Sequence, residues 1–577
     1  MLINGAALNT VALNTLGGGQ GSAMEPVAVP QSVLWSCRVM LGTEDVTAKV
    51  AGKVRVEREE GAAAIAEFSL YLPDDGVDVV GWTGRSVEIF YLESRESGWI
   101  EEERFDGWLE QPSYDPRNRI VSCAATDRLQ DLVEAMEIDA IDTVVGGTWT
   151  ADVFEATEGR SRWDYATERL ASVAGSLDRS VGGVLRVTPW KAQAPLKRFG
   201  PGSTIDGSLS VDLAKLSDRI NQVEITFSYR FSRLRERHQA YNWQHPDIQG
   251  WSVDNSFCIW RGNSTELPTI EMVEEALNSA GYKLLSGAEF LTVPLSGVYC
   301  DPPQAWNNQF NNLLLAANVV GGMRWVQPIT EKYVLTVEAP TSVAQAGPVL
   351  RRDGEALESE LKRSEDWESA EFTDPEPDAV QDAIEDYLVD LREEDRLATA
   401  ASCLLEGARV SILGAHRGNK VAWQVPTTMA LGIDLVHTVL MEDRIQAQGK
   451  VFSLIDEFDL QGQTAISTIT LAISRGGGTI DDPTTLPAPP ASDVTGTIPA
   501  LIQLPTQLRG RGQMTYDDTL DGFSGNYDEL DIGTPTEEFP RRHQTTAPEV
   551  PAEHRDEFTA ETAKTYRVAI PNDLLRL

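Results

Sequence analysis

The most regular alternation of apolar and polar positions runs from Gly432 to Arg475. Successive side chains of a β-strand point to opposite faces, so a period of two predicts strands with one buried face. Short polar turns around Met441 and Gln461 divide the run into three antiparallel strands. The alternating positions are Ile433, Leu435, His437 and Val439; Ile445, Ala447, Gly449, Val451, Ser453 and Ile455; and Ser467, Ile469, Leu471 and Ile473.

A second β-rich segment extends from Ser36 to about Leu132. Its apolar residues also recur at every second position, and a turn-forming sequence from Tyr114 to Arg119 punctuates it. The pattern predicts another antiparallel β-domain. The residues that carry it are Val50, Val54 and Val56; Ala66, Phe68, Leu70 and Leu72; Val87, Ile89 and Tyr91; Phe105 and Trp108; and Ile120, Ser122 and Ala124.

The middle of the chain mixes two periodicities. Helical spacing follows Ser161, and Gly182-Gly183 then leads into a strand over residues 184–188. A second helix is expected over residues 270–280, residues 307–320 are a further apolar candidate, and Tyr333, Leu335 and Val337 alternate as a strand. These signals predict a small α/β region.

Residues 351–406 hold 19 acidic and 6 basic side chains. Their spacing predicts an amphipathic helix with one apolar and one anionic face. The anionic face is compatible with the lining of a passage, although a solvated face is the commoner case. The apolar stripe is Val380, Ile384, Tyr387, Leu388, Leu391, Ala398, Ala401 and Leu405, opposite Asp382, Glu385, Asp386, Asp390, Glu393 and Glu394.

Periodicity ends after Arg475. Residues 481–577 contain 11 prolines, 17 acidic and 8 basic residues, a composition that cannot fold alone. We expect an extended arm over neighbouring subunits, with the end of the chain added to a partner's sheet edge, so deletion of residues 481–577 should leave a folded protein. The expected anchors are Leu501, Ile502, Leu504, Phe523, Tyr527, Phe539 and Tyr566.

The expected fold class is therefore α+β, mostly β and multidomain, with two antiparallel barrel-like ring domains. The expected domains are an N-terminal arm with a Gly-rich spacer (1–35), a first β-barrel (36–135), middle α/β domains (136–350), an acidic helical region (351–415), a second β-barrel (416–475) and a Pro-rich C-terminal arm (476–577). The N-terminal arm is expected to pair with a neighbour.

Composition limits the functional classes. A net charge of −39 argues against nucleic acid as a bound ligand, because phosphate contacts need a basic surface. It is compatible with DNA passing along an acidic wall, and equally with a role in solubility alone. Five scattered cysteines predict buried thiols in a reducing compartment rather than disulfides, and no signal peptide or membrane span is expected.

The notable basic cluster is Arg230, Arg233, Arg235, Arg237 and His238. Aromatic residues between these cations are compatible with a nucleic-acid stripe. The acidity of the rest of the chain instead favours ion pairs with carboxylates of a neighbouring subunit.

Catalytic templates lack their residues. The six histidines form no HExxH motif, and neither a GxSxG elbow nor a Walker A loop occurs. Residues Asp517 to Asp528 partly match a calcium loop but carry Thr519 and a final Asp, so an acidic turn is the preferred interpretation. Tryptophans at 149, 163, 243, 251 and 260 could stack on sugars, although buried tryptophans are commoner. We expect no enzyme, cofactor, catalytic residue or metal ligand.

Three sequence stretches resemble the baseplate hub, or tail-tip hub, of long-tailed phages, a family related to late control protein D. They are RFDGWLEQPSYDPRNRIVSCAATDRLQDL (104–132), WDYATERLASVAGSLDRSVGGVLRVTPW (163–190) with DRINQVEITFSYRFSRL (218–234), and AQGKVFSLIDEFDLQGQTAISTITLAISR (447–475).

The resemblance implies a structural virion protein of a non-contractile tail, assembled in the host bacterial cytoplasm. It implies a homotrimeric ring that adapts a six-fold tube to a three-fold tip. It further implies contacts with the tail tube, distal tail protein, tape measure protein and central fibre or tip proteins, while DNA passes without specific binding. The alternatives are a receptor- or glycan-binding tail-tip protein, which would bind isolated envelope, and an envelope-degrading enzyme, which would clear a zymogram.

Overall fold

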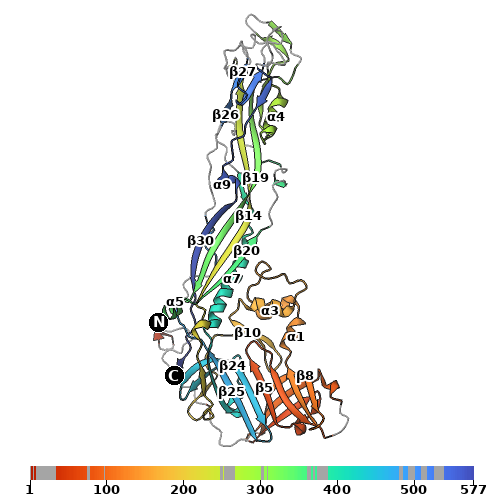
Figure 1. Ribbon diagram of the computed structural model, residues 1–577, viewed down its shortest axis with the longest axis vertical. Coiled ribbons are helices and arrows are strands. Elements are labelled where there is room, and N and C mark those ends of the chain that lie inside the picture. The colour runs from red at the N-terminus through yellow and green to blue at the C-terminus, as the bar shows by residue number, and fades with distance from the viewer. Residues whose placement is uncertain are drawn as a thin grey trace.

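The computed structural model describes residues 2–3, 6–7, 27, 34–73, 78–95, 98–246, 248, 251, 267–299, 304–307, 310–359, 366–367, 371–372, 387–479, 485–490, 501–508, 516–525 and 539–577. The molecule is elongated, and a long ribbon rises from a broad β-sheet base to a small tip (Figure 1). Strands dominate and belong to several sheets. The expected multidomain, mostly β class is confirmed.

The first half of the base is a curved antiparallel sheet with strand order β5-β6-β9-β8-β7-β3-β4. Its core includes Val54, Phe68, Ile89 and Phe105. The alternation seen in the sequence therefore corresponds to one dry face. The elements are β3 (Trp35–Leu41), β4 (Glu44–Asp45), η1 (Thr47–Lys49), β5 (Lys53–Glu59), β6 (Ile65–Tyr71), η2 (Val80–Trp82), β7 (Ser86–Arg95), β8 (Gly98–Asp115) and β9 (Ile120–Thr126).

The second half contains the three strands expected after Gly432, with β24 between its two antiparallel neighbours. Segments from distant parts of the sequence complete this half: β12 pairs with β23, and β13 pairs with β22. The elements are β12 (Lys197–Phe199), β13 (Ser210–Asp212), η3 (Leu216–Asp218), β22 (Asn419–Pro426), α8 (Thr427–Ala430), β23 (Thr438–Glu442), β24 (Gln446–Asp459) and β25 (Thr464–Ile473).

The alternation expected for this half is wrong in two places. Residues 433–437 precede β23 and are not in a strand. The register of β24 shifts between Val451 and Ser453, so Leu454 and Phe458 are fully buried while Ile455 is half-buried. A β-bulge inserts one extra residue and thereby moves the following side chains to the other face.

The two halves form one continuous sheet, because β24 pairs antiparallel with β5 from Ser453–Glu59 to Asp459–Lys53. Phe458 of β24 lies in the hydrophobic core of the first half, 5.8 Å from Tyr91 between ring centroids. The base is therefore two curved sheet halves joined edge to edge.

A small α/β unit follows the first half. Ser161 caps α3 by accepting hydrogen bonds from the amides of Trp163 and Asp164, as expected for a helix that starts there. The strand expected at 184–188 is β11, which pairs with β10. The elements are α1 (Leu129–Glu134), α2 (Ile138–Val145), α3 (Arg162–Leu170), β10 (Gly175–Arg179) and β11 (Leu185–Pro189).

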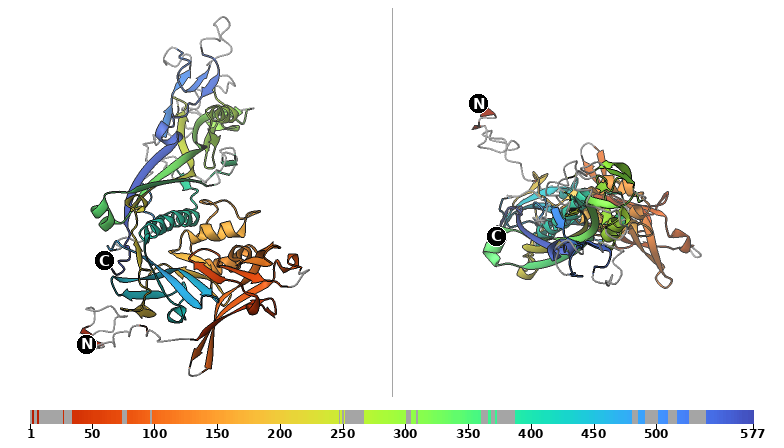
Figure 2. Two further views of the ribbon diagram at one scale, coloured as in Figure 1. Left: turned by 60° about the horizontal axis from the view of Figure 1, so that its bottom comes forward. Right: turned by 90° about the horizontal axis from the view of Figure 1, so that it is seen from above.

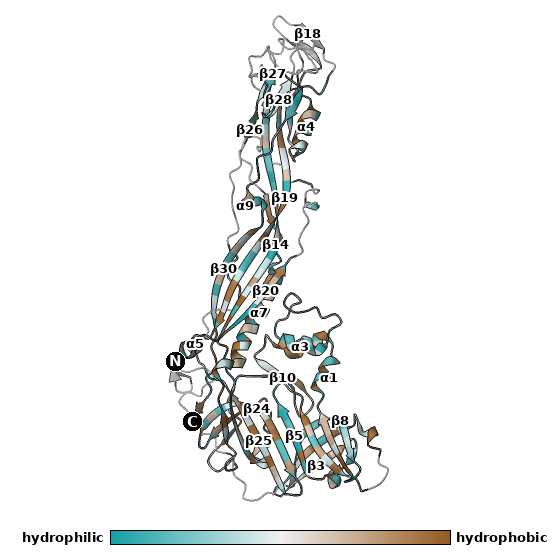
Figure 3. Ribbon diagram, viewed as in Figure 1, coloured by the Kyte–Doolittle hydropathy of each residue, from teal (hydrophilic) through white to brown (hydrophobic). Residues whose placement is uncertain are grey.

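The ribbon consists of β14 (Gln222–Gln244) and β19 (Leu314–Glu338), which pair antiparallel over all 23 residues of β14. At about 3.3 Å per residue this pair is about 75 Å long. Residues 314–320 thus belong to a strand, and both faces of that part of β19 are buried, which explains why no alternation marks it. Figure 3 shows brown and teal alternating along the lower ribbon, where one face is open.

Helix α7 (Glu394–Ala415) packs against the lower ribbon, and Figure 2 shows it between the ribbon and the base, beside α3. It begins later than expected, because Tyr387–Asp390 form strand β21 on β14. Residues 380–386 of the expected stripe lie outside the described residues. Among the described residues α7 alone has the length and composition of a membrane span, but Leu397, Ala401 and Leu405 lie in the core beneath the ribbon.

The described strands of the C-terminal segment pair with sheets of its own chain. β26 (Leu501–Leu504) adds to β14, β30 (Phe558–Arg567) adds parallel to β19, and β31 (Leu575–Arg576) adds to β24. Strand addition was expected, but the sheet edges belong to the same subunit. Tyr566 is buried, whereas Tyr527 lies outside the described residues.

The remaining short elements lie mostly toward the tip or beside the ribbon. Near the N-terminus, β1 (Leu2–Ile3) and β2 (Ala6–Ala7) pair with each other, and the Gly-rich run 17–22 lies outside the described residues. The other elements are α4 (Ile270–Ser279), β15 (Lys283–Leu284), β16 (Glu289–Thr292), β17 (Ser296–Tyr299), β18 (Gln304–Asn307), α5 (Pro340–Ala346), β20 (Leu350–Glu358), β27 (Thr506–Leu508), β28 (Gly522–Gly525), β29 (Arg542–Gln544) and α9 (Ala552–Arg555).

Candidate functional site

Two arginines of the basic cluster on β14 form ion pairs inside the subunit. Arg233 donates two hydrogen bonds to Asp390 of β21 at 2.6 and 2.8 Å, and Arg230 pairs with Glu358 of β20 at 3.0 Å. The expectation that these arginines pair with a neighbouring subunit is therefore wrong for both. Arg233, Arg235 and Arg237 are only 2–3% exposed, so they do not form a nucleic-acid stripe.

Asp390 lies in the strand Tyr387–Asp390, where the sequence pattern predicted a helix. Its carboxylate was expected on the anionic face of a helix, but it is used by Arg233 in a strand pairing. A bidentate ion pair and a β-ladder outweigh local helical spacing. Glu394 and Asp395 do occupy the first turn of α7, where carboxylates interact favourably with the helix dipole.

A network of buried charges joins the two halves of the base. Arg104 of β8 donates to Asp456 of β24 from Nε at 2.9 Å and from Nη2 at 3.1 Å. Its Nη1 donates to Glu102 at 2.6 Å, and Glu102 in turn accepts from the amide of Gly432. Burial opposes the charge on Arg104, but Asp456 and Glu102 outweigh it and raise the pKa of the guanidinium.

The same network reaches the α/β unit. Arg186 of β11 donates to Asp434 at 2.7 Å and to Asp178 at 2.9 Å, while Arg58 of β5 donates to Asp434 at 3.1 Å. Burial raises the pKa of Asp434, but the nearby Arg58 and Arg186 hold it below its usual value overall. These pairs fix three parts of the chain relative to one another.

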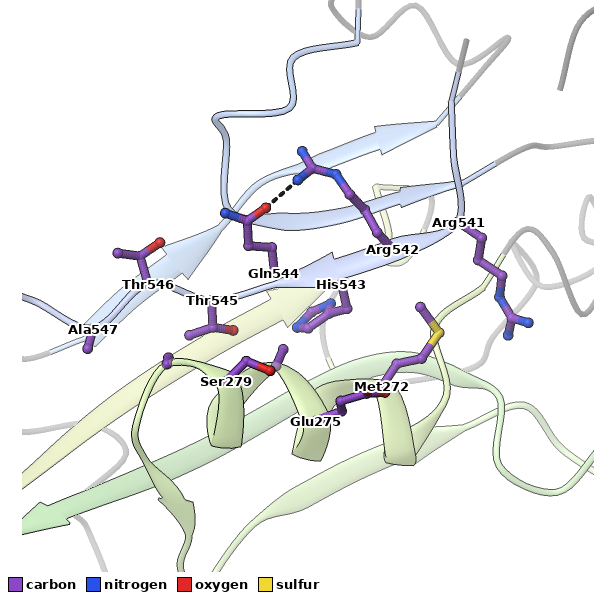
Figure 4. A pocket seen from close by; sticks show the side chains of 12 residues that line it. Met272, Glu275, Ser279, Arg541, Arg542, His543, Gln544, Thr545, Thr546 and Ala547 are labelled. Carbon is purple, nitrogen blue, oxygen red and sulfur yellow. Dashed lines mark hydrogen bonds between the residues drawn. The ribbon is translucent and has the colours of Figure 1, made fainter. Parts of the chain in front are cut away.

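The tip carries an open pocket of about 760 Å³. Figure 4 shows Met272, Glu275 and Ser279 of α4 on one side and the extended segment from Arg541 to Ala547 on the other. Neither ring nitrogen of His543 has a hydrogen-bond partner among the described residues, and burial lowers its pKa to about 4. The pocket presents hydroxyl, amide and charged groups to solvent.

The partial calcium motif does not assemble a metal site in its described part. Asp517 accepts hydrogen bonds from Thr519, and Asp521 accepts from the amide and hydroxyl of Thr546. Residues 526–528 lie outside the described residues. In the part of the chain that the structure covers, no group of three or more His, Cys, Asp or Glu residues could hold a metal ion.

The tryptophans considered for sugar stacking are dispersed. Trp149 and Trp163 pack in the core of the α/β unit, whereas Trp243 is buried at the tip against Phe523. Trp251 is 40% exposed, and Trp260 lies outside the described residues. The described tryptophans therefore do not line a common cleft.

Two outer strands at the foot of the ribbon were not predicted. β20 and β30 flank β14 and β19, and most of their residues are exposed or half-buried. Beside β20, a groove of about 600 Å³ is lined by residues 351–355, by α7 residues that include Leu404 and Ser411, and by Val153 and Phe154. A mixed sequence with modest alternation, such as LRRDGEALE, gave no sign of this position.

No protein-family model matches the chain, and no curated protein matches it. Among solved structures it is similar to the tail protein from Neisseria meningitidis MC58, at 10% identity and TM-score 0.34, over 76% of this chain and 96% of that chain. It is similar to the 43 kDa tail protein of prophage MuSo2 from Shewanella oneidensis, at 9% identity and TM-score 0.35, over the same shares.

A third similar structure is a type VI secretion component from E. coli, described as structurally similar to the T4 bacteriophage tail proteins gp27 and gp5. It is 6% identical with TM-score 0.26, over 88% of this chain and 92% of that chain.

Proposed function

We propose that this protein is a structural hub of a long, non-contractile phage tail, in which three copies form a ring that closes the distal end. The observation that carries the proposal is the edge-to-edge union of two curved sheet halves through β5 and β24. A ring of three subunits then contains six similar sheet halves, which can contact a six-fold tube. The same ring presents a three-fold surface to the tip. The hub-like sequence stretches at 104–132 and 447–475 lie on these two halves.

The buried ion pairs suit a subunit that transmits force. Arg104–Asp456 and the two guanidinium contacts of Asp434 hold the halves and the α/β unit in one arrangement. A ring contact that depends on both halves needs such a fixed geometry. In this proposal the distal tail protein and tube contact the base, while the ribbon faces the central fibre or other tip proteins.

The proposed passage of DNA through the ring depends on the negative net charge of the protein. The net charge is −39, and the cations of β14 are buried or engaged by the chain's own carboxylates. A polyanion is repelled by the net negative charge of such a protein, so DNA can pass along the channel of the tape measure protein without being retained. The proposed location is the virion tail after assembly in the bacterial cytoplasm, without stable membrane insertion.

The test is direct imaging of the purified protein by negative-stain and cryo-electron microscopy. Three-fold rings with a central hole are the expected result. A particle that stays a single elongated subunit at the highest concentration the protein tolerates would contradict the ring. Labelling in assembled tails then tests its position at the distal end.

A second candidate function is receptor or glycan binding, and the tip pocket is the observation that favours it. Its hydroxyl, amide and charged groups could contact sugar hydroxyls. Binding of the purified protein to isolated envelope should then fall on Glu275→Ala or Thr545→Ala, while Glu274→Ala on the same helix should leave binding unchanged. Equal binding by all three variants would reject the tip pocket as the receptor site.

A further inference from the structure

The foot of the ribbon is a four-stranded sheet with order β20-β14-β19-β30 and an unbroken register. Gly354, Thr226, Val334 and Ala563 lie on one level across the four strands. In the described part of the chain, neither β20 nor β30 has another strand on its outer side. Among the described strands the sheet therefore ends at β20, of nine residues, and at β30, of ten residues.

Open sheet edges present unpaired amide and carbonyl groups and are templates for strand addition. β20 runs parallel to β14, and β30 runs parallel to β19, while β14 and β19 are antiparallel. The two outer edges therefore run in opposite directions. When copies are related by rotation about an axis along the strands, the β30 edge of one copy meets the β20 edge of the next in the antiparallel sense.

We infer that β30 of one copy adds to β20 of the next copy, and that this contact closes the ring around the foot of the ribbon. The inference rests on the proposed ring and identifies the surface that forms it. Such a head-to-tail contact uses two different surfaces, and it closes when the rotation between copies permits. The groove beside β20 gives the incoming strand space between the sheet edge and α7.

One pair of opposite charges would face across the two edges. When Gly354 of one copy faces Ala563 of the next, Asp353 of β20 lies opposite Lys564 of the neighbouring β30. Both side chains are then on the face that α7 covers. Opposite charges directly across an antiparallel pair stabilise it. Within one subunit Asp353 accepts from Arg351 at 3.0 Å, and it remains only part-buried.

The face away from α7 becomes the inner wall of this ring. Odd-numbered residues of β14, such as Val223 and Phe227, are buried under α7, whereas Thr226 on the other face is exposed. The charges of the open face pair across strands, as Arg352 does with Glu224 and Lys332 does with Glu561. A wall of hydroxyls and paired charges offers a passing polyanion little to bind.

The test introduces one cysteine on each edge, as Gly354→Cys and Ala563→Cys in the full-length chain. Both positions are exposed and on the open face. Within one subunit they lie three strand spacings apart, about 14 Å, which is beyond the reach of a disulfide. Any disulfide between them must therefore join two copies, and the three described native cysteines are buried.

After mild oxidation, non-reducing electrophoresis should show linked dimers and trimers for the double variant alone. The wild type and each single variant are the matched controls. A tilt between neighbouring copies would change which residues of β20 and β30 face each other. Gly354→Cys is therefore also combined with Glu561→Cys or with Thr565→Cys, which test registers shifted by two residues in either direction. Mass photometry of the reduced proteins establishes whether each variant still forms the same oligomer.

Three outcomes test the edge contact and the hub ring separately. Links in any of the three double variants, with trimers as the largest closed species, support the edge contact. Three-fold rings in the microscope with no link in any register overturn the edge contact and leave the proposed hub intact. Exclusively monomeric protein in both experiments overturns the hub ring and the edge contact together.

Discussion

The guanidinium of Arg104 and the carboxylate of Asp456 are 352 residues apart in sequence and form a buried bidentate pair, 1% and 0% exposed. Each residue belongs to a different half of the base. A charge removed this far from water needs a partner with good geometry, because desolvation otherwise exceeds the Coulomb attraction. The pair therefore couples the folding of the two halves.

Asp456→Asn should lower the free energy of unfolding by about 3 kcal/mol, because Arg104 loses its buried bidentate partner and keeps only the partly exposed Glu102 as a counter-charge. Urea unfolding followed by tryptophan fluorescence measures the change. Glu457→Gln, one position along the same strand on the exposed face, is the control and should change stability by less than about 0.5 kcal/mol. Equal effects of the two substitutions would show that the pair does not couple the halves.

Gly449→Ala should destabilise the second half of the base. A Cβ at this position would lie 2.5 Å from the carbonyl oxygen of Ala472 on the neighbouring strand, so the backbone must shift. Gly407→Ala in α7 meets no atom within 4 Å and should raise stability by up to about 1 kcal/mol through helix propensity. Thermal unfolding of both variants should show shifts of opposite sign.

Removal of residues 481–577 should produce an unstable protein, contrary to the expectation from composition. Tyr566 is 1% exposed in the core beneath the ribbon, and its hydroxyl donates to the carbonyl of Thr485. The single change Tyr566→Ala should already cost about 3–5 kcal/mol, as for other large buried aromatic residues. Exposed Thr565→Ala is the control, and a truncated protein with an unchanged unfolding midpoint would contradict this assignment.

The tip should lose stability in acid. Burial lowers the pKa of His543 to about 4, whereas an unfolded histidine titrates near 6.5. Between these values the unfolded state binds more protons, so stability falls as the pH decreases through this window and levels off below about 4. His543→Gln should remove this part of the pH dependence, measured by hydrogen exchange of the tip at pH 7 and pH 4.5.

Sequence periodicity identified the strands whose two faces differ. The alternation predicted β25, the strands of the first half, and β24 as far as the bulge after Val451. It did not predict the centre of the ribbon, where residues 231–241 of β14 are all buried. Periodicity is lost when both faces of a strand are covered.

The ion pairs could not be assigned from sequence either. An acidic residue near Arg233 was expected from a neighbouring subunit, but Asp390 supplies it from 157 residues away in the same chain. The bulge after Val451 similarly moved Asp456 from the exposed face to the position where Arg104 binds it. Both ion pairs depend on which strands pair with each other in the folded protein.

The sequence by itself determined the mostly β class, the two β-rich segments, the helix that follows Ser161 and the absence of recognisable catalytic motifs, because local periodicity, capping and residue type encode these features. Only the tertiary structure decided that β5 joins β24, that the C-terminal segment returns to its own sheet and that β20 and β30 are the outermost described strands at the foot of the ribbon. Strand partners are selected by non-local hydrogen bonds, burial and charge pairing, which no local window of sequence contains.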